Sequence, residues 1–137
     1  MIKFFSEEID FKVPKPLKTR QWLSSICKSV DYDLNTLNYI FCSDQYLLEI
    51  NKQYLDHDYF TDIITFDNSE EEGVLEGDIY ISVDRVRDNA QTFETDFETE
   101  LRRVIVHGLL HLMGFEDTSE ELKKEMRAKE DACLLLF

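Results

Sequence analysis

The sequence predicts a single α/β (or α+β) domain in which a mixed sheet of about four strands is covered by about five helices. The length of 137 residues suits one domain with its own hydrophobic core. The composition is globular, because 43% of the residues are hydrophobic while only four are glycine and two are proline. Short apolar runs rich in β-branched residues alternate with segments whose apolar residues recur at helical spacing. The predicted order is strand, helix, strand, helix, strand, strand, helix, helix, helix.

The first half of the chain supplies two predicted strands and two predicted helices. Pro14 and Pro16 end the first strand, and proline suits the opening turn of the helix that follows. Ser43 can cap the second helix, because its hydroxyl can accept a hydrogen bond from a free N–H of the first turn. These elements are a strand over residues 2–5, a helix over 17–30, a strand over 37–42 and a helix over 44–54.

The second half supplies two further strands and three further helices. The acidic run over residues 68–73 is predicted to be a solvated loop or hairpin tip between the two strands. Thr95 with Glu98, and Thr118 with Glu121, fit the capping box that opens a helix. These elements are strands over residues 61–66 and 77–82, a helix over 84–93, a helix after Thr95 and a last helix after Thr118.

Composition also narrows the setting in which the protein works. No apolar run approaches the ~20 residues of a membrane-spanning helix, and the N-terminus turns acidic too early for a signal peptide. Cys27, Cys42 and Cys133 are scattered and form no C-x-x-C pair, so we expect neither disulfides nor a thiolate zinc site. We therefore expect a cytoplasmic protein with no membrane partner.

Charge is distributed unevenly along the chain. The net charge of −14 at pH 7 argues against wholesale electrostatic wrapping of nucleic acid. The stretch over residues 11–30, however, holds five basic residues and no acidic one. If the protein touches a polyanion, Lys15, Lys18 and Lys28 are the candidate contacts and Trp22 a candidate stacking partner. The alternative interpretation is a solvated helix face beside a core tryptophan.

The strongest chemical signal lies in the apolar stretch over residues 104–113. His107 and His111 interrupt it four positions apart, so on a helix they project from the same face. Gly114 predicts a left-handed helix stop, after which Asp117 can return as a third ligand. Two imidazoles and a carboxylate are typical zinc ligands, and the sequence predicts a metal site at the end of a buried helix. The alternative is a pair of core histidines with satisfied hydrogen bonds.

The same stretch fits the H-x-x-x-H-x-x-G-x-x-[H/D] frame of the metzincin proteases, with one departure. Those enzymes carry a glutamate directly after the first histidine as general base, and here that position is Gly108. A glycine inside a helix costs roughly 1 kcal/mol relative to alanine. We therefore expect a strand or a ligand to approach the backbone closely at Gly108.

With these segments placed, the sequence resembles the YbeY family, a bacterial rRNA maturation factor and endoribonuclease. The family patterns are N-x-x-Y-R, T-[DN]-[VI]-L-S-F, G-D-[IL] and H-G-x-L-H-L-x-G-[YF]-D-H. The matching segments here are residues 51–55, 61–66, 77–79 and 107–117. The resemblance implies one metal-dependent hydrolase domain over residues 1–137. It also implies a zinc-dependent ribonuclease that prefers single strands, matures the 3′ end of small-subunit rRNA and supports ribosome quality control.

The resemblance implies one Zn²⁺ per chain, held by the three histidines of the last pattern. Here Asp117 replaces the third histidine, so the implied ligands are His107, His111 and Asp117. No side chain is identified as catalytic, and the implied nucleophile is a water on the metal. The implied partners are small-subunit rRNA and the ribosomal particle or its assembly factors.

A second departure concerns Leu55, which stands where the family usually carries an arginine. Phosphate charge must then be met by other groups, of which Lys52 and His57 are nearest in sequence. His57 is otherwise an ordinary loop histidine. Glu100 falls on the histidine side of the helix and either orients His107 or is a surface carboxylate. Two other functions stay open: a non-catalytic zinc-binding ribosome-assembly factor and, less favoured, a metalloprotease.

Overall fold

The structure is a computed structural model that describes all residues, 1–137, and it contains the predicted four strands and five helices in the predicted order. The strands are β1 (Ile2–Glu7), β2 (Asp33–Cys42), β3 (Ile63–Asp67) and β4 (Val74–Ser82). The helices are α1 (Pro16–Ser29), α2 (Asp44–Leu55), α3 (Val83–Thr92), α4 (Phe97–Leu112) and α5 (Glu120–Leu134).

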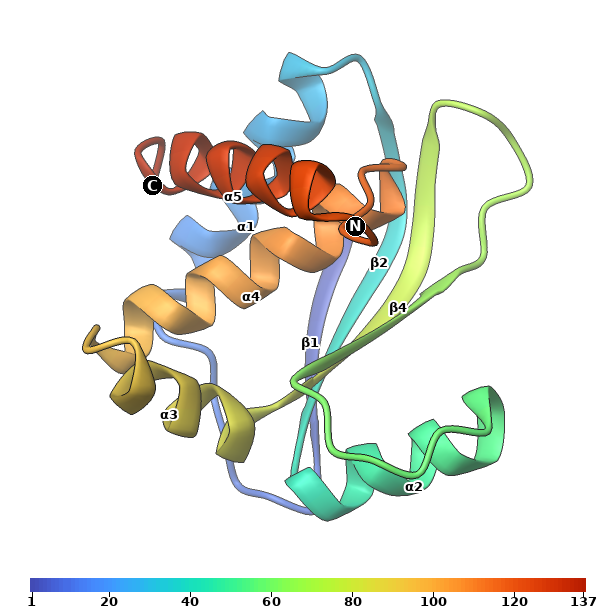
Figure 1. Cartoon of the computed structure of the whole chain (residues 1–137). Coiled ribbons are helices and arrows are strands. Elements are labelled where there is room, and N and C mark those ends of the chain that lie inside the picture. Colours follow the sequence, from blue (N-terminus) through green and yellow to red (C-terminus); the bar gives the residue numbers. More distant parts are fainter.

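The four strands form one mixed sheet in the order β1-β2-β4-β3 (Figure 1). Strands β1, β2 and β4 are parallel, and β3 lies at the edge, antiparallel to β4. In the centre of the sheet Ile79 pairs with Tyr39 on one side and with Thr65 on the other. The predicted fold class, a mixed sheet covered by helices, is therefore confirmed.

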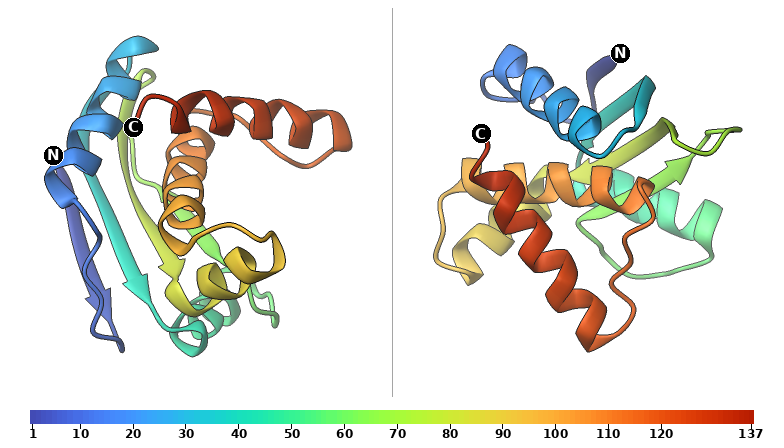
Figure 2. Two further views of the ribbon diagram at one scale, coloured as in Figure 1. Left: turned by 90° about the vertical axis from the view of Figure 1, so that its left-hand side faces the viewer. Right: turned by 90° about the horizontal axis from the view of Figure 1, so that it is seen from above.

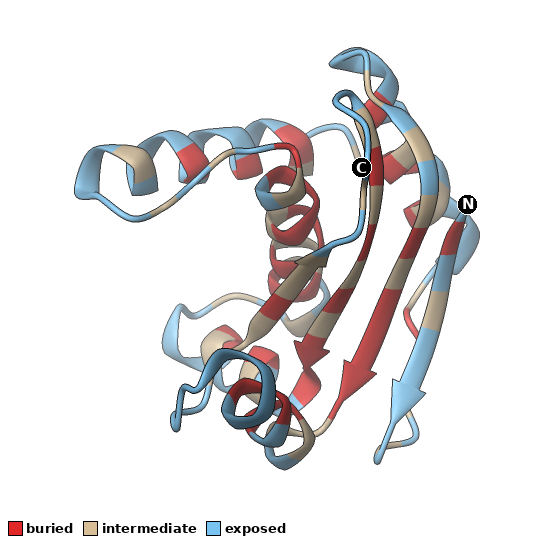
Figure 3. Ribbon diagram, turned by 90° about the vertical axis from the view of Figure 1, so that its right-hand side faces the viewer, coloured by how far each residue is buried: buried red, intermediate tan, exposed pale blue.

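The two faces of the sheet are covered unequally. The main core of 23 buried residues joins one face of the sheet to α1, α4 and α5, with α5 crossing the outer side of α4 (Figure 2). On the other face α2 packs over a smaller cluster that includes Leu47 and Ile64. Buried residues accordingly concentrate in β2, β4 and α4 (Figure 3). Helix α4, which carries the two histidines, is thus held between the sheet and α5.

Gly108 lies where α4 packs directly on the sheet. A Cβ atom added at Gly108 would lie 2.9 Å from side-chain atoms of Ile63 on β3 and Ile79 on β4. The expected close approach to the backbone is therefore confirmed, and its cause is the packing of the two strands. This contact places the middle of α4, and with it His107, against the edge of the sheet.

The predicted helix caps are correct for α2 and wrong by one residue for α4 and α5. Ser43 caps α2 as predicted. Asp96, not Thr95, caps α4, and Ser119, not Thr118, caps α5. In both cases two adjacent residues can cap, and the one that does accepts the backbone N–H three positions later.

The strand boundaries also differ from the prediction. Strand β2 begins at Asp33 rather than at residue 37, because Asp33 and Leu34 pair with the first residues of β4. Strand β3 begins at Ile63, so Thr61 and Asp62 precede the strand. This difference matters for function, because Asp62 lies beside His107 in the cleft described below.

The remaining sequence expectations concern cysteines and membrane segments. Cys27, Cys42 and Cys133 are all buried and free, as the absence of a disulfide framework predicted. None of the helices combines the length and the apolar character needed to cross a bilayer.

Candidate active site

The end of α4 positions its second histidine. Gly114 adopts a φ of +98°, and its N–H donates to the carbonyl of His111 at 3.0 Å. The N–H of Phe115 donates to the carbonyl of Leu110 at 3.1 Å, which completes a Schellman motif. The chain then turns back, and the carbonyl of Phe115 lies 3.1 Å from Nδ1 of His111. The predicted stop at Gly114 is confirmed, and it leaves Nε2 of His111 free.

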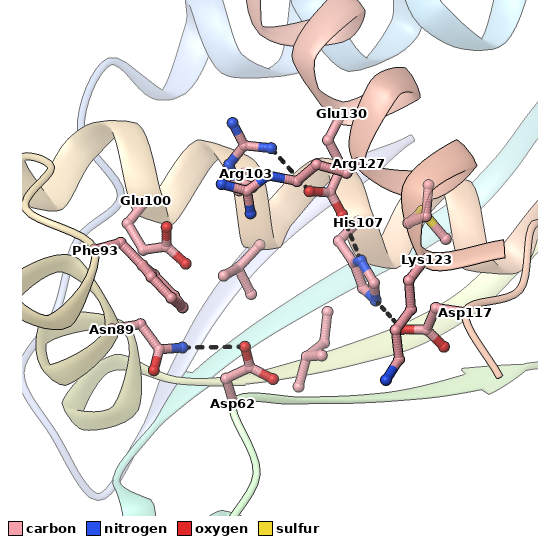
Figure 4. A pocket seen from close by; sticks show the side chains of 13 residues that line it. Asp62, Asn89, Phe93, Glu100, Arg103, His107, Asp117, Lys123, Arg127 and Glu130 are labelled. Carbon is pink, nitrogen blue, oxygen red and sulfur yellow. Dashed lines mark hydrogen bonds and ion pairs between the residues drawn. The ribbon is translucent and has the colours of Figure 1, made fainter. Parts of the chain in front are cut away.

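His107 is held from both sides of its ring (Figure 4). Its Nδ1 lies 2.6 Å from Oε2 of Glu130 on α5, and its Nε2 lies 3.6 Å from Oδ2 of Asp117. Glu130 is only 5% exposed, and Nη1 of Arg103 lies 3.0 Å from its other carboxylate oxygen. Arg103 in turn contacts Asp131 at 2.6 Å. A chain of charges that runs from exposed Asp131 through Arg103 to buried Glu130 therefore fixes the orientation of His107.

The same contacts shift the pKa of His107. Burial lowers the pKa of its imidazole. The hydrogen bond and negative charge of Glu130, together with the charges of Asp117 and Asp62, outweigh burial, so the pKa of His107 is raised above its ordinary value. The ring is thus surrounded by groups that favour a cation at this position.

The three predicted ligands lie together but do not all converge. Two ligands of one tetrahedral zinc lie roughly 3.3 Å apart, given zinc–ligand distances near 2.0–2.1 Å. The 3.6 Å between His107 and Asp117 is close to that spacing. The rings of His107 and His111 are nearly parallel, with centres 6.2 Å apart. As the side chains stand, no three His, Cys, Asp or Glu residues are close enough to hold a metal ion.

Two cavities meet at His107 and Asp117, which line both of them together with Asp62 and Ile63. The cavity of about 360 Å³, called here the α5 cavity, is bounded by α3, α4 and α5. The cavity of about 560 Å³, called here the α2 cavity, is bounded by the end of α2 and the loop that follows it. Together they form one cleft with His107 near its middle.

The α2 cavity contains the position at which the family carries arginine. Leu55 lines this cavity, and so does His57, whose Nδ1 lies 2.9 Å from the hydroxyl of Tyr59. Lys52 lines neither cavity, and its ammonium group lies 3.8 Å from Glu49 and 3.6 Å from Asp58. Of the two groups nearest to Leu55 in sequence, only His57 therefore faces the cleft.

The basic stretch on α1 lies elsewhere. Lys15, Lys18 and Lys28 are exposed and line neither cavity. Trp22 is 4% exposed, and its Nε1 donates to the carbonyl of Cys133 at 2.8 Å. The prediction that RNA stacks on Trp22 is therefore wrong, and the alternative interpretation of Trp22 as a core residue is correct.

Sequence reasoning assigned Glu100 the wrong role and missed Glu130. Glu100 is 5% exposed, so it is not a surface carboxylate, and the partner of His107 is Glu130 instead. Glu100 lines the α5 cavity, where burial raises its pKa, and burial likewise raises the pKa of Asp62. No local pattern links Glu130 to a histidine 23 residues earlier on another helix.

Comparison with known proteins identifies the family. The sequence profile described as Endoribonuclease YbeY matches residues 4–137. The chain belongs to the YbeY endoribonuclease family. The prediction of this family from the sequence is therefore confirmed.

Individual YbeY relatives match over nearly their whole length. An Endoribonuclease YbeY from Cytophaga hutchinsonii is 54% identical over 135 residues, covering 98% of this chain and 94% of that protein. An Endoribonuclease YbeY from Flavobacterium psychrophilum is 49% identical over 133 residues, covering 97% and 94%. The solution structure of TM1509 from Thermotoga maritima superposes with a TM-score of 0.73 at 31% identity, covering 99% of this chain and 88% of that one.

Proposed function

We propose that this protein is an endoribonuclease that hydrolyses single-stranded RNA in the cleft formed by the α2 and α5 cavities. Its YbeY relatives carry the name endoribonuclease, and their similarity extends over the whole chain. We place the reaction in this cleft because the ring of His107 is fixed by Glu130 and faces Asp117 where the two cavities meet.

We propose that His107, His111 and Asp117 hold one Zn²⁺ per chain. Imidazole nitrogen and carboxylate oxygen are both zinc donors, and the spacing of the His107–Asp117 pair fits the ion. When bound, the ion would supply Lewis-acid stabilisation of a phosphoryl oxygen in an RNA phosphodiester. Residues 1–137 would then work as one metal-dependent hydrolase domain.

The protein's own residues prepare this site. In the zinc-bound protein Glu130 would accept a hydrogen bond from Nδ1–H of His107, which would leave the Nε2 lone pair to bind the ion. The carbonyl of Phe115 would do the same for His111. Arg103 contacts the other carboxylate oxygen of Glu130 at 3.0 Å and holds this side chain in place. Gly108 has no side chain, so no general base of the metzincin type stands next to His107.

We further propose that the substrate is the 3′ end of small-subunit rRNA, encountered in the cytoplasm within a ribosomal particle or with its assembly factors. The support for this substrate is the family resemblance. Three free, buried cysteines suit a reducing compartment.

One observation favours a second function, a non-catalytic zinc-binding ribosome-assembly factor. The α2 cavity has no lysine or arginine in its lining, and Leu55 occupies the position at which the family carries arginine. In this alternative the zinc would only tie the end of α4 to the turn that carries Asp117.

The test compares the purified, zinc-loaded protein with and without chelator on labelled single-stranded RNA and on casein. We expect RNA cleavage that the chelator abolishes and that is absent in His111→Ala. The variant should still fold, with the melting temperature of the metal-free wild type. Metal-dependent melting without RNA cleavage would support the assembly role, and chelator-sensitive casein cleavage would support a protease.

A further inference from the structure

The α5 cavity is a part of the cleft with no role in the proposed zinc site. It extends from His107 and Asp117 between α3, α4 and α5 (Figure 4), and Leu55 lines the other cavity, not this one. The lysine and arginine side chains that line the cleft all lie here, on Arg103, Lys123 and Arg127. Any protein cation that contacts RNA phosphates within the cleft must therefore come from this side.

Two of these three cations are available to a ligand. Arg103 is committed to Glu130 and Asp131, at 3.0 and 2.6 Å. Lys123 contacts only Glu120, at 3.6 Å, and that carboxylate is 89% exposed, so water readily replaces the contact. Arg127 forms none of the chain's ion pairs. Lys123 and Arg127 stand one helical turn apart on α5, so both reach the same cavity.

The acidic side chains of the cavity oppose an anion less than their number suggests. Glu130 is neutralised by Arg103, and Asp117 faces His107. Glu100 is only 5% exposed, so it is withdrawn from the surface that a ligand would contact. Lys123 and Arg127 are exposed, whereas Asp62 and Asp117 are half-buried and Glu100 and Glu130 are buried.

An exposed aromatic ring also lines the α5 cavity. Phe93, just after the end of α3, is 57% exposed and lines the cavity with Arg127 and Lys123. A phenylalanine that remains exposed beside cations offers a face on which an unpaired base can stack. In the α2 cavity Tyr59 stacks on His57 and is 56% exposed, so each half of the cleft presents an aromatic ring.

We propose that the α5 cavity binds the single strand next to the scissile bond, with Lys123 and Arg127 on a backbone phosphate and Phe93 stacked on a base. This subsite rests on the proposed ribonuclease function and adds to it a place where the RNA strand binds. It supplies from α5 the phosphate-binding charge that Leu55 does not supply from α2. It also explains a preference for single strands, because only an unpaired base can lie on Phe93.

The test measures binding without turnover, using the zinc-loaded protein and a short fluorescent 2′-O-methyl oligoribonucleotide that cannot be cleaved at its 2′ positions. We expect Lys123→Ala/Arg127→Ala to bind at least tenfold more weakly, with a salt slope lower by about 0.7 per lost phosphate contact. The charge-matched control Lys124→Ala/Lys129→Ala, on the same helix outside the cavity, should bind within about twofold of wild type. Equal affinities for the two double variants would overturn the proposal.

The stacking part is tested by Phe93→Ala, for which we expect roughly fivefold to hundredfold weaker binding of the same oligonucleotide. The control is Phe60→Ala, because Phe60 is an exposed phenylalanine that lines neither cavity; the Arg85 guanidinium lies over its ring. Equal loss in the two variants would contradict stacking on Phe93. Circular dichroism and melting of each variant establish that it is folded.

The basic stretch on α1 is the competing binding surface. Lys15→Ala/Lys28→Ala should retain more affinity than the α5 cavity variant, and the reverse order would overturn the proposal. Because the oligonucleotide is bound but not cut, the outcome does not depend on catalysis. Failure of the wild type to cleave RNA would refute the proposed function, whereas failure of Lys123→Ala/Arg127→Ala to lose affinity would refute only this subsite.

Discussion

Glu130 on α5 is the side chain that orients His107 in the site. It is buried, it contacts His107 at 2.6 Å through one oxygen and Arg103 at 3.0 Å through the other. A buried carboxylate is costly unless it is paired, and here both partners also belong to the cleft. Its position is therefore explained by the orientation of His107 rather than by the stability of α5 alone.

We predict that Glu130→Gln lowers zinc affinity about 10- to 100-fold, because a neutral amide orients His107 less firmly and raises its basicity less. Competition against a chromophoric chelator measures the effect. The matched control is Glu125→Gln, an exposed position on the same helix, which should bind zinc like wild type. Equal affinity of the two variants would show that Glu130 does not act through His107.

At the scale of elements, the start of α5 determines where Glu130, Lys123 and Arg127 lie. Ser119 opens this helix, with its hydroxyl accepting from the N–H of Leu122 at 3.1 Å. Ser119 follows closely after Asp117 in the short segment that connects α4 to α5. The position of Asp117 is therefore tied to the start of α5.

We predict that Ser119→Ala lowers the free energy of unfolding by about 1 kcal/mol, as expected for loss of a helix cap. Thr118→Ala, one residue earlier, should change it by no more than a few tenths of a kcal/mol, because Ser119 and not Thr118 caps the helix. Urea unfolding of the metal-free proteins compares the two. A larger loss at Thr118 would contradict the observed cap.

At the scale of the whole molecule, three thiols from α1, β2 and α5 are enclosed in the interior. Cys27, Cys42 and Cys133 are each less than 10% exposed. Burial raises the pKa of Cys27 to about 11 and that of Cys42 to about 12, and it also raises the pKa of Cys133. The three thiols therefore stay protonated through the neutral range.

We predict that the native protein reacts slowly with thiol reagents at around pH 8, since the thiolate is the reactive form and a raised pKa reduces its population. In denaturant all three cysteines should react at the rate of a free thiol. Rapid labelling of even one cysteine in the native protein would show that the elements enclosing that cysteine open from the core.

The sequence alone determined which segments became strands and helices, because hydrophobic periodicity is a local property of the chain. It also determined the spacing of His107 and His111 and the stop at Gly114. Where two neighbouring residues were equally able to cap a helix, as at Thr118 and Ser119, local chemistry was insufficient to choose between them.

The tertiary structure alone decided which elements share the site. It brought Glu130 to His107, joined two cavities at His107 and Asp117, and buried Trp22 against the end of α5. These contacts join residues far apart in sequence. They depend on how α4 packs between the sheet and α5, which is a property of the assembled core and has no local pattern in the chain.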